Sequence, residues 1–354
     1  MDAAADRCLI YMAQTADRGI TWSNATARPE LHAYVDSDWQ VDCSTSGWCI
    51  LYGRAVVSYG SKRQACIALS STEAEIMAAS QAACEILYVR GLLAEMGVDM
   101  STPTVLHVDN SGAVELFKDL KSCQRLRHIE RRFLKLRELV SSGQIIVKFC
   151  PTADNHADLM TKSLPSDVYD KHATAIMGVK NDTCVPRQRP SRRLRTFDVE
   201  AAYLKGKFQE SEVHYVRPPI GYRTFTRGNV PVVWRLKAPL YGEADAGRIW
   251  NRTLVQQLVG IQQFEQSDYD PCYFWKKLAD GSRMDVVMYV DDGFVVDSYS
   301  SCADAELEAL HHAFTVDVKP ARFFLGTNIT VHDPKSVESA AGAHIVALLA
   351  AQRA

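Results

Sequence analysis

Two groups of acidic residues, in different parts of the chain, have the spacing expected of metal-binding carboxylates. In the N-terminal half, four acids each lie at the edge of an expected strand or helix: Asp36, Glu75, Asp109 and Asp158. In the C-terminal half, Tyr289-Val290-Asp291-Asp292 lies between apolar runs, and Asp198 stands far upstream. Magnesium prefers hard oxygen ligands, and two Mg²⁺ ions roughly 3.5–4 Å apart can activate a water and stabilise a leaving oxygen. Both groups therefore indicate two-metal chemistry at phosphates.

Two positions in the N-terminal group have close rivals. Asp38 follows Asp36 by two residues, and because side chains alternate along a strand, both could lie on one face. Glu73 completes Ser70-Ser71-Thr72-Glu73, a capping box, and a capping role is expected for it. We expect Asp36 and Glu75 to be the site residues.

The intervening sequence predicts elements that would carry these acids toward one another. Apolar and β-branched runs indicate strands, and apolar residues three or four apart indicate helices. The expected elements are a helix over 5–18, strands over 32–35, 48–52 and 55–59, a helix from the capping box to Gly97, a strand over 105–108, a helix over 128–139, a strand over 144–149 and a last helix, capped by Asp154, that carries Asp158.

The second half has its own pattern, after a stretch of Asn, Asp, Pro and Arg that reads as a linker. We predict a first domain over 1–178, a linker over 179–193, a second domain over 194–332 and an unstructured tail over 333–354. The expected elements of the second domain are strands over 194–199, 232–236, 285–290 and 294–296 and a helix over 249–258. Asp291-Asp292-Gly293 would then form the turn of a hairpin.

Composition excludes several classes of protein. A length of 354 residues favours two domains, and a formal net charge of −2 argues against a wholly basic nucleic-acid binder. One arginine-rich cluster, over 125–137, could still contact phosphates. A second, over 187–195, we interpret as part of the linker.

The ten cysteines form no Cys-x-x-Cys pair, which fits free thiols in a reducing compartment. The acidic N-terminus does not resemble a signal peptide, and we expect no apolar run long enough to cross a bilayer. The predicted location is cytoplasmic or nuclear, not secreted, with no membrane partner.

The N-terminal motifs resemble the ribonuclease H domain of copia-type retrotransposon Pol proteins. The resemblance covers most of residues 5–178 and rests on four segments in order, over 34–39, 68–75, 107–111 and 155–162. It implies a ribonuclease H-like mixed five-stranded sheet with helices, of the α/β class. It also implies that Asp36, Glu75, Asp109 and Asp158 hold the metal pair, with Glu75 favoured by its Glu-Ile-Met-Ala-Ala register. The nucleic acid contacts implied by the resemblance are Arg127, His128, Arg131 and Arg132.

The second half resembles the palm of copia-type reverse transcriptase, an α+β fold, over about 194–332. Phe197-Asp198-Val199 and Tyr289-Val290-Asp291-Asp292 carry this resemblance. It implies Asp198 and Asp291 as metal ligands, with Asp292 as the accompanying acid. The implied nucleotide-binding residues are Tyr203, Tyr289 and Arg248.

This second resemblance is incomplete. Asp245 and Gly247 stand where the family usually has Gln and Pro, and the finger region that should precede Asp198 is missing. The family also places the polymerase before the nuclease, whereas the order here is reversed. A palm without the parts that position its substrates is not expected to polymerise alone.

The leading hypothesis is a retrotransposon-derived Pol fragment that hydrolyses RNA in RNA/DNA hybrids, with an incomplete RNA-directed DNA polymerase domain. Each acid cluster would take two Mg²⁺ ions, or Mn²⁺. Expected partners are the RNA/DNA hybrid and template-primer nucleic acid, with other Pol or Gag components as further candidates. The alternative is an inactive element relic or a host-captured nucleic-acid-binding module. An unrelated metal-dependent phosphatase or nuclease would explain only one of the two acid groups.

Overall fold

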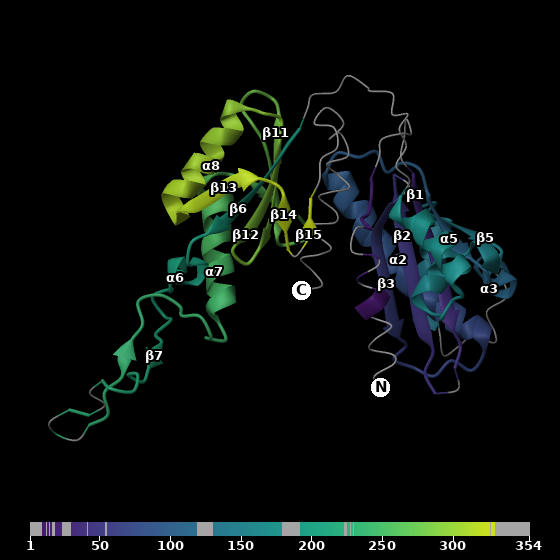
Figure 1. Ribbon diagram of the computed structural model, residues 1–354, viewed down its shortest axis with the longest axis horizontal. Coiled ribbons are helices and arrows are strands. Elements are labelled where there is room, and N and C mark those ends of the chain that lie inside the picture. Colours follow the sequence, from purple (N-terminus) through teal and green to yellow (C-terminus); the bar gives the residue numbers. More distant parts are fainter. Residues whose placement is uncertain are drawn as a thin grey trace. The chain divides into compact units, whose positions relative to one another are not determined.

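The computed structural model describes two compact units, one within residues 9–178 and the other within 192–329 (Figure 1). It describes residues 9–22, 30–118, 130–178 and 192–329, except for single positions at 12, 14, 16, 17, 41, 54, 223, 224, 227, 229 and 326. The predicted linker up to 191 and the predicted tail over 333–354 lie outside the described residues, so these boundaries stay predictions.

The first unit is built on a five-stranded mixed sheet with strand order β3-β2-β1-β4-β5. Its strands are β1 (Leu31–Asp38), β2 (Thr45–Tyr52), β3 (Ala55–Arg63), β4 (Thr104–Val108) and β5 (Ile145–Phe149). The first three pair antiparallel, β4 pairs parallel to β1, and β5 pairs parallel to β4. This arrangement confirms the predicted ribonuclease H-like sheet.

The long helix α2 (Ser71–Glu95) covers the sheet and carries much of the core. Ser70 caps it, since its side-chain oxygen accepts from the backbone N–H of Glu73 at 3.2 Å. Glu73 in turn accepts from the backbone N–H of Leu69 at 2.9 Å, as expected for a capping partner. Ile76, Ile86 and other apolar residues of α2 are fully buried, so the helix places Glu75 against the sheet.

Of the remaining helices of this unit, the one predicted over 128–139 is present as Glu130–Ser141, and several others were not predicted. These remaining helices are α3 (Ser111–Lys118), α4 (Glu130–Ser141), η2 (Thr152–Asp154), η3 (His156–Met160) and α5 (Ser166–Met177). Helix α3 was not predicted. The prediction of one last helix capped by Asp154 is wrong: Asp158 lies in the 3₁₀-helix η3, whose cap is Asn155, and α5 is a separate helix.

We expected no apolar segment long enough to cross a membrane. Judged by length and composition alone, this expectation is wrong. Helix α2 is 25 residues long and apolar enough to pass that test. Its apolar window is 67% buried inside the unit, where it packs on the sheet, as the core helix of a globular fold does.

The second unit contains a six-stranded antiparallel sheet with order β13-β6-β12-β11-β10-β9. Its strands are β6 (Arg193–Val199), β9 (Glu265–Gln266), β10 (Tyr273–Lys277), β11 (Arg283–Tyr289), β12 (Asp292–Asp297) and β13 (Val316–Pro320). Its helices are α6 (Ala202–Lys205), α7 (Ala246–Val255), the π-helical turn η4 (Gln256–Ile261) and α8 (Ser301–Phe314). The predicted β11–β12 hairpin therefore forms the centre of this sheet.

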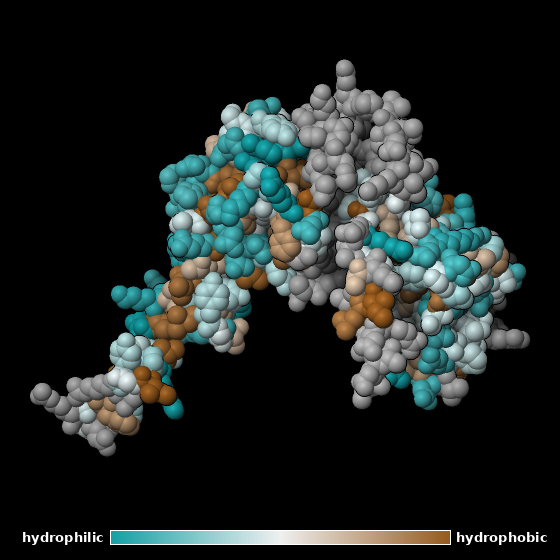
Figure 2. All heavy atoms as spheres, viewed as in Figure 1, coloured by the Kyte–Doolittle hydropathy of each residue, from teal (hydrophilic) through white to brown (hydrophobic). Residues whose placement is uncertain are grey.

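Two short strand pairs complete the unit: β7 (Tyr215–Val216) with β8 (Trp234–Arg235), and β14 (Phe323–Phe324) with β15 (Thr327–Asn328). The predicted strand over 232–236 is reduced to β8. Strand β7 lies on an arm that extends away from the sheet of this unit (Figure 1), and apolar side chains are exposed along it (Figure 2).

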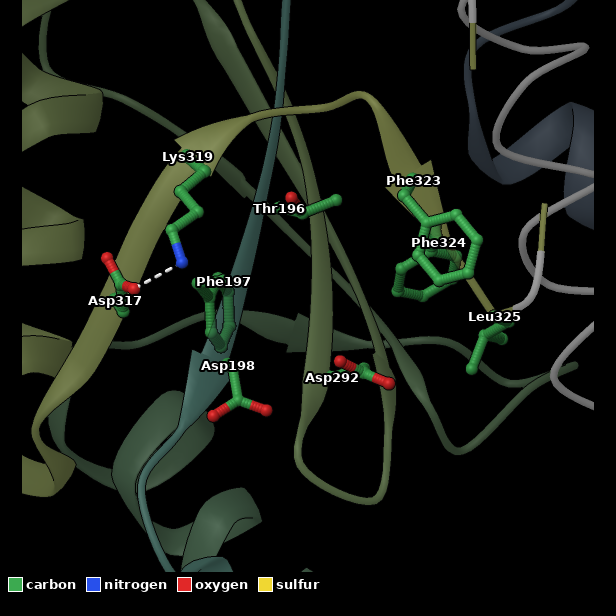
Figure 3. Close-up of a pocket in the computed structure, with 9 residues that line it drawn as sticks. All are labelled: Thr196, Phe197, Asp198, Asp292, Asp317, Lys319, Phe323, Phe324 and Leu325. Atoms are coloured by element: carbon green, nitrogen blue, oxygen red, sulfur yellow. Dashed lines mark ion pairs between the residues drawn. The ribbon is translucent and has the colours of Figure 1, made fainter. Parts of the chain in front are cut away.

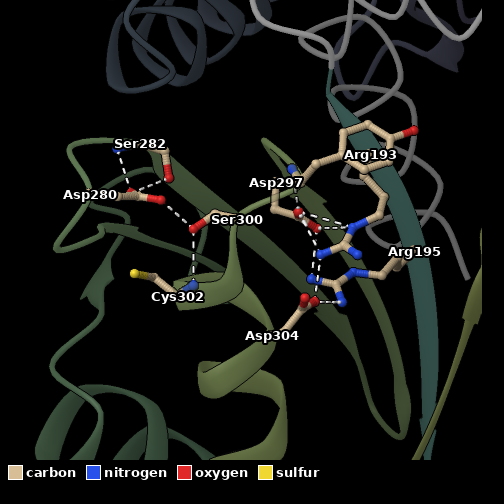
Figure 4. A network of polar contacts seen from close by, with 9 residues as sticks. Arg193, Arg195, Asp280, Ser282, Asp297, Ser300, Cys302 and Asp304 are labelled. Atoms are coloured by element: carbon tan, nitrogen blue, oxygen red, sulfur yellow. Dashed lines mark hydrogen bonds and ion pairs between the residues drawn. The ribbon is translucent and has the colours of Figure 1, made fainter.

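The second arginine cluster is not only a linker, which corrects the prediction. Arg193 and Arg195 are residues of β6 and pair with two acids, Asp297 and Asp304 (Figure 4). Asp297 is fully buried, and burying a carboxylate is costly unless cations and hydrogen bonds compensate it. The two arginines therefore belong to the packed structure of the second unit.

Candidate active site

Three carboxylates of the first unit converge from three different elements. Asp36 lies on β1, Asp109 follows β4 directly, and Asp158 lies in η3. One oxygen of each lies within 4.8 Å of the others. Because β1 and β4 are parallel neighbours, with Val35 opposite Val108, the residues that follow these two positions emerge at the same end of the sheet.

A buried asparagine and a glycine place η3 against the sheet. The Asn155 side-chain amide donates to the Val35 carbonyl at 2.9 Å, directly before Asp36. Gly47 lies opposite Asp36 on β2, where an added Cβ would be 2.6 Å from Thr161 Cγ2 and 2.8 Å from Met160 Cβ. Only glycine allows η3 to approach so closely, which brings Asp158 within reach of Asp36.

Glu75 approaches the same cluster from α2 but is not one of the three grouped oxygens. Its Oε1 accepts from the backbone N–H and the hydroxyl of Ser37, at 3.0 and 2.8 Å. Its Oε2 is buried and has no hydrogen-bond partner among the residues that the structure describes. Burial raises the pKa of Glu75 to about 8, Ser37 opposes this, and the charges of Asp36 and Asp109 add to it. Glu75 is therefore largely protonated at neutral pH in the metal-free chain.

Side chains that the sequence analysis did not single out hold the three carboxylates. Lys162 Nζ lies 3.0 Å from Asp36 Oδ1 and 3.1 Å from Asp158 Oδ1. The Thr161 hydroxyl donates to the other oxygen of Asp36, and the Thr152 hydroxyl donates to Asp109 Oδ2 at 2.9 Å. The signal available in the sequence was Thr161-Lys162, three and four residues after Asp158, because that spacing returns to the same helix face.

The charges of this cluster are unequal. Burial and the neighbouring Asp36 raise the pKa of Asp158 to about 6, although Lys162 lowers it. Burial alone would lower the pKa of Lys162, but Asp36 and Asp158 raise it above its usual range, so Lys162 stays charged.

The residues present fit a divalent metal. Asp36, Asp109 and Asp158 offer hard oxygen ligands from separate elements, which is the donor set that Mg²⁺ and Mn²⁺ favour. The unpartnered buried oxygen of Glu75 is a fourth donor beside them. The rival Asp38 is only half-buried, hydrogen-bonds Gln40 and is not in the group.

The predicted nucleic acid contacts of this unit are not positioned by the structure. Arg127 and His128 lie outside the described residues. Arg131 and Arg132 lie in α4, but their side chains are outside what the structure describes. Their roles stay predictions.

In the second unit, Asp198 on β6 and Asp292 on β12 are direct cross-strand partners. Both line a pocket whose other wall is apolar, formed by Phe323, Phe324 and Leu325 (Figure 3). Burial and the charges of Asp291 and Asp198 raise the pKa of Asp292. The pair that shares this pocket is thus Asp198 with Asp292.

Of the predicted metal ligands Asp198 and Asp291, only Asp198 lines this pocket, and their role as a metal pair stays a prediction. Asp291 lies in the hairpin turn, where its carbonyl accepts from the Val199 backbone N–H at 3.0 Å. Val290, just before it, has φ +55°, and the Trp250 indole donates to its carbonyl. A β-branched residue in the left-handed region is strained, so the indole contact helps to hold this turn. Among the described residues, the acids of this unit form no group of three within the distance seen in the first unit.

A further charged pair beside Asp198 escaped the sequence analysis. Asp317 on β13 lies directly opposite Asp198 in register and pairs with Lys319 (Figure 3). Both residues line the same pocket, so three acids and one lysine surround it.

The predicted nucleotide-binding residues are partly engaged elsewhere. Arg248 pairs with Glu212 at 3.5 Å and with Asp245 at 3.3 Å. The Tyr203 ring packs against Tyr241, with ring centroids 4.6 Å apart. Tyr289 lies opposite Asp292 at the end of the hairpin. Two carboxylates thus lie beside the exposed Arg248 guanidinium.

Comparisons with known proteins find one family model and several relatives that match parts of this chain. Residues 187–338 match the family described as reverse transcriptase (RNA-dependent DNA polymerase). The chain is 34% identical over 181 residues to the retrovirus-related Pol polyprotein from transposon RE2 of Arabidopsis thaliana, covering 50% of this chain and 12% of that protein. It is 32% identical over 146 residues to the corresponding polyprotein from transposon TNT 1-94 of Nicotiana tabacum, covering 40% and 11%.

Solved ribonucleases H are also similar to part of the chain. RNase H1 from Halobacterium salinarum NRC-1 is 19% identical, with a TM-score of 0.28, over 40% of this chain and 98% of that one. LC11-RNase H1 in complex with RNA/DNA hybrid is 14% identical, with a TM-score of 0.28, over 41% and 100%. At these scores the fold assignment rests instead on the strand order and pairing of the first unit.

Proposed function

We propose that this chain, which belongs to the copia-type retrotransposon Pol family, uses its first unit to hydrolyse the RNA strand of RNA/DNA hybrids. The observation that carries the proposal is the convergence of Asp36, Asp109 and Asp158 within 4.8 Å. Carboxylates this close repel one another, and bound divalent cations would offset that repulsion. Such a cluster therefore indicates a metal-binding function. The chain covers about an eighth of the curated polyproteins it matches, and their other activities are not assigned to it.

The divalent ions would be held by Asp36, Asp109, Asp158 and Glu75. When bound, they would activate a water molecule and stabilise the leaving oxygen of a phosphodiester. Glu75 must lose its proton to become a ligand, because its pKa of about 8 keeps it largely neutral in the free chain. The Thr152 hydroxyl donates to Asp109 Oδ2 and so helps to orient this carboxylate.

The substrate is recognised by shape rather than by sequence in this proposal. A hybrid has A-form geometry, and proteins read it through the backbone and the 2′-hydroxyl groups. Cleavage is therefore expected with little preference for particular bases.

Cleavage of a labelled RNA/DNA hybrid by the purified chain tests the function. We expect Mg²⁺-dependent cleavage by the parent and a loss of about 100-fold or more in Asp109→Asn, which keeps the size of the side chain but removes a ligand charge. Asp38→Asn is the matched control, since Asp38 lies two residues from Asp36 but outside the cluster, and it should cleave like the parent. A folded parent that binds hybrid without cleaving it would favour the nucleic-acid-binding alternative.

For the second unit we propose an incomplete polymerase palm. The pairing of Arg248 with Glu212 and Asp245 favours this view, since it engages a predicted nucleotide-binding residue. Primer extension on an RNA template should give no product with this chain under conditions in which a complete reverse transcriptase extends the same primer. Product formed by the parent and lost in Asp198→Asn would refute the proposal.

A further inference from the structure

Lys162 occupies the gap between two proposed metal ligands. Its ammonium nitrogen lies 3.0 Å from Asp36 Oδ1 and 3.1 Å from Asp158 Oδ1. The two aspartates are 1% and 4% exposed, whereas the lysine side chain is 34% exposed. The lysine side chain thus enters the cluster from the solvent side. Its flexible stem allows the ammonium group to move away from the carboxylates into solvent.

The same gap is where a divalent ion would bind. Mg²⁺ binds carboxylate oxygens at about 2.0–2.1 Å, so it cannot share the space between these two oxygens with an ammonium group. Asp36 has both oxygens engaged in the free chain, Oδ1 by Lys162 and Oδ2 by Thr161. An ion that takes the two oxygens bound by Lys162, Asp36 Oδ1 and Asp158 Oδ1, must displace the ammonium group from them.

We infer that Lys162 is a built-in counter-ion that keeps the acid cluster assembled without metal and is displaced when a divalent ion binds. This inference rests on the proposed function, because it assumes that the cluster binds such ions. Lys162 is a positioning residue in this role. Two consequences follow for its loss: the metal-free cluster loosens through repulsion between carboxylates, and the divalent ion binds more tightly because no ammonium competes with it.

Calorimetric titration of the full chain with Mn²⁺ tests the second consequence. We expect Lys162→Met to lower the dissociation constant of the cluster by about tenfold or more, and Lys162→Arg, which keeps the positive charge, to stay close to the parent. Asp109 is one of the three grouped acids, so Asp109→Asn should lose the heat of Mn²⁺ binding to this cluster. A parallel titration of that variant therefore separates this heat from the heat of binding to acids of the second unit.

Lys171→Met is the matched control for the loss of one positive charge. Lys171 Nζ lies 3.0 Å from Asp154 Oδ1, close to the 3.0 and 3.1 Å of the Lys162 pairs, but this pair is exposed and outside the cluster. Its loss should change Mn²⁺ affinity less than about twofold, because exposed pairs are screened by water and salt.

Amide hydrogen exchange over residues 156–162 tests the first consequence. The Lys162 backbone N–H donates to the Asp158 carbonyl, so it reports on η3 directly. In Lys162→Met these amides should exchange faster than in the parent without metal, and Mn²⁺ should restore their protection. A purely structural lysine would give faster exchange without tighter metal binding.

The outcomes separate the inference from the proposed function. Saturable Mn²⁺ binding by the parent, with equal or weaker binding by Lys162→Met, overturns the inference and leaves the function standing. No binding by either chain overturns both. Binding by Lys162→Met alone supports the inference and shows that the lysine blocks the cluster in the parent.

Discussion

Glu75→Gln is expected to abolish hybrid cleavage and, at the same time, to stabilise the metal-free chain at pH 8. Glutamine keeps an oxygen to accept from the backbone and hydroxyl of Ser37, but it cannot supply the negative charge that a divalent ion requires. We expect cleavage to fall by about 100-fold or more, measured on the same labelled hybrid.

The stability effect follows from the raised pKa of Glu75, which is about 8 against an ordinary value of 4.5. Between these pH values the folded chain keeps a proton that the unfolded chain has released, so the stability of the parent falls as pH rises from about 4.5 to about 8. Asp158, with its pKa raised to about 6, acts in the same direction over the lower part of this range. Glutamine removes the Glu75 contribution, which is on the order of 2–4 kcal/mol at pH 8.

Urea unfolding in EDTA at pH 5 and pH 8 measures this difference. The gain of Glu75→Gln over the parent should be larger at pH 8 than at pH 5. Glu73→Gln is the matched control, because Glu73 lies two residues earlier and its role is to accept from the Leu69 backbone, which glutamine can also do. A variant Glu75→Gln that cleaves normally would remove Glu75 from the site, and an unchanged pH dependence would contradict its buried, protonated state.

Gly293→Ala should strongly destabilise the second unit. Gly293 lies on β12 directly opposite Phe197 on β6, and an added Cβ would overlap the ring of Phe197, which is 2% exposed. The ring cannot move outward without opening the core, so we expect a loss of about 3 kcal/mol in the free energy of unfolding. The same two strands carry Asp198 and Asp292, and their pocket would be distorted as well.

Thermal and urea unfolding of the full chain check this expectation. Gly260→Ala is a control in the same unit, because its Cβ would meet only Gln256 Cγ, at an ordinary 3.8 Å. In a Phe197→Ala background, Gly293→Ala should cost less than it does in the parent, because the smaller side chain leaves room for the new methyl group. Equal stability of Gly293→Ala and the parent would show that the sheet accommodates the methyl group without cost.

Much of the candidate nuclease site could be predicted from local sequence. Asp36 and Asp109 each stand at or just after a short apolar run, and parallel pairing brings those positions to one edge of a sheet. The capping box located the start of α2 and so placed Glu75. Helix boundaries were less predictable: η3 is a short 3₁₀-helix held by Asn155, whose partner, Val35, is 120 residues away in sequence.

The sequence by itself determined the two sets of acidic motifs, the order of the two halves, and the three acids that converge in the first unit, Asp36, Asp109 and Asp158. Only the tertiary structure decided that Lys162 bridges Asp36 and Asp158, that Glu75 is buried enough to hold a proton, and that Asp292 is the cross-strand partner of Asp198. The physical reason is that these properties depend on strand register and on burial. Both arise from contacts between segments far apart in sequence, 126 residues for Lys162 and Asp36 and 38 for Glu75 and Ser37, and local patterns of residues do not encode them.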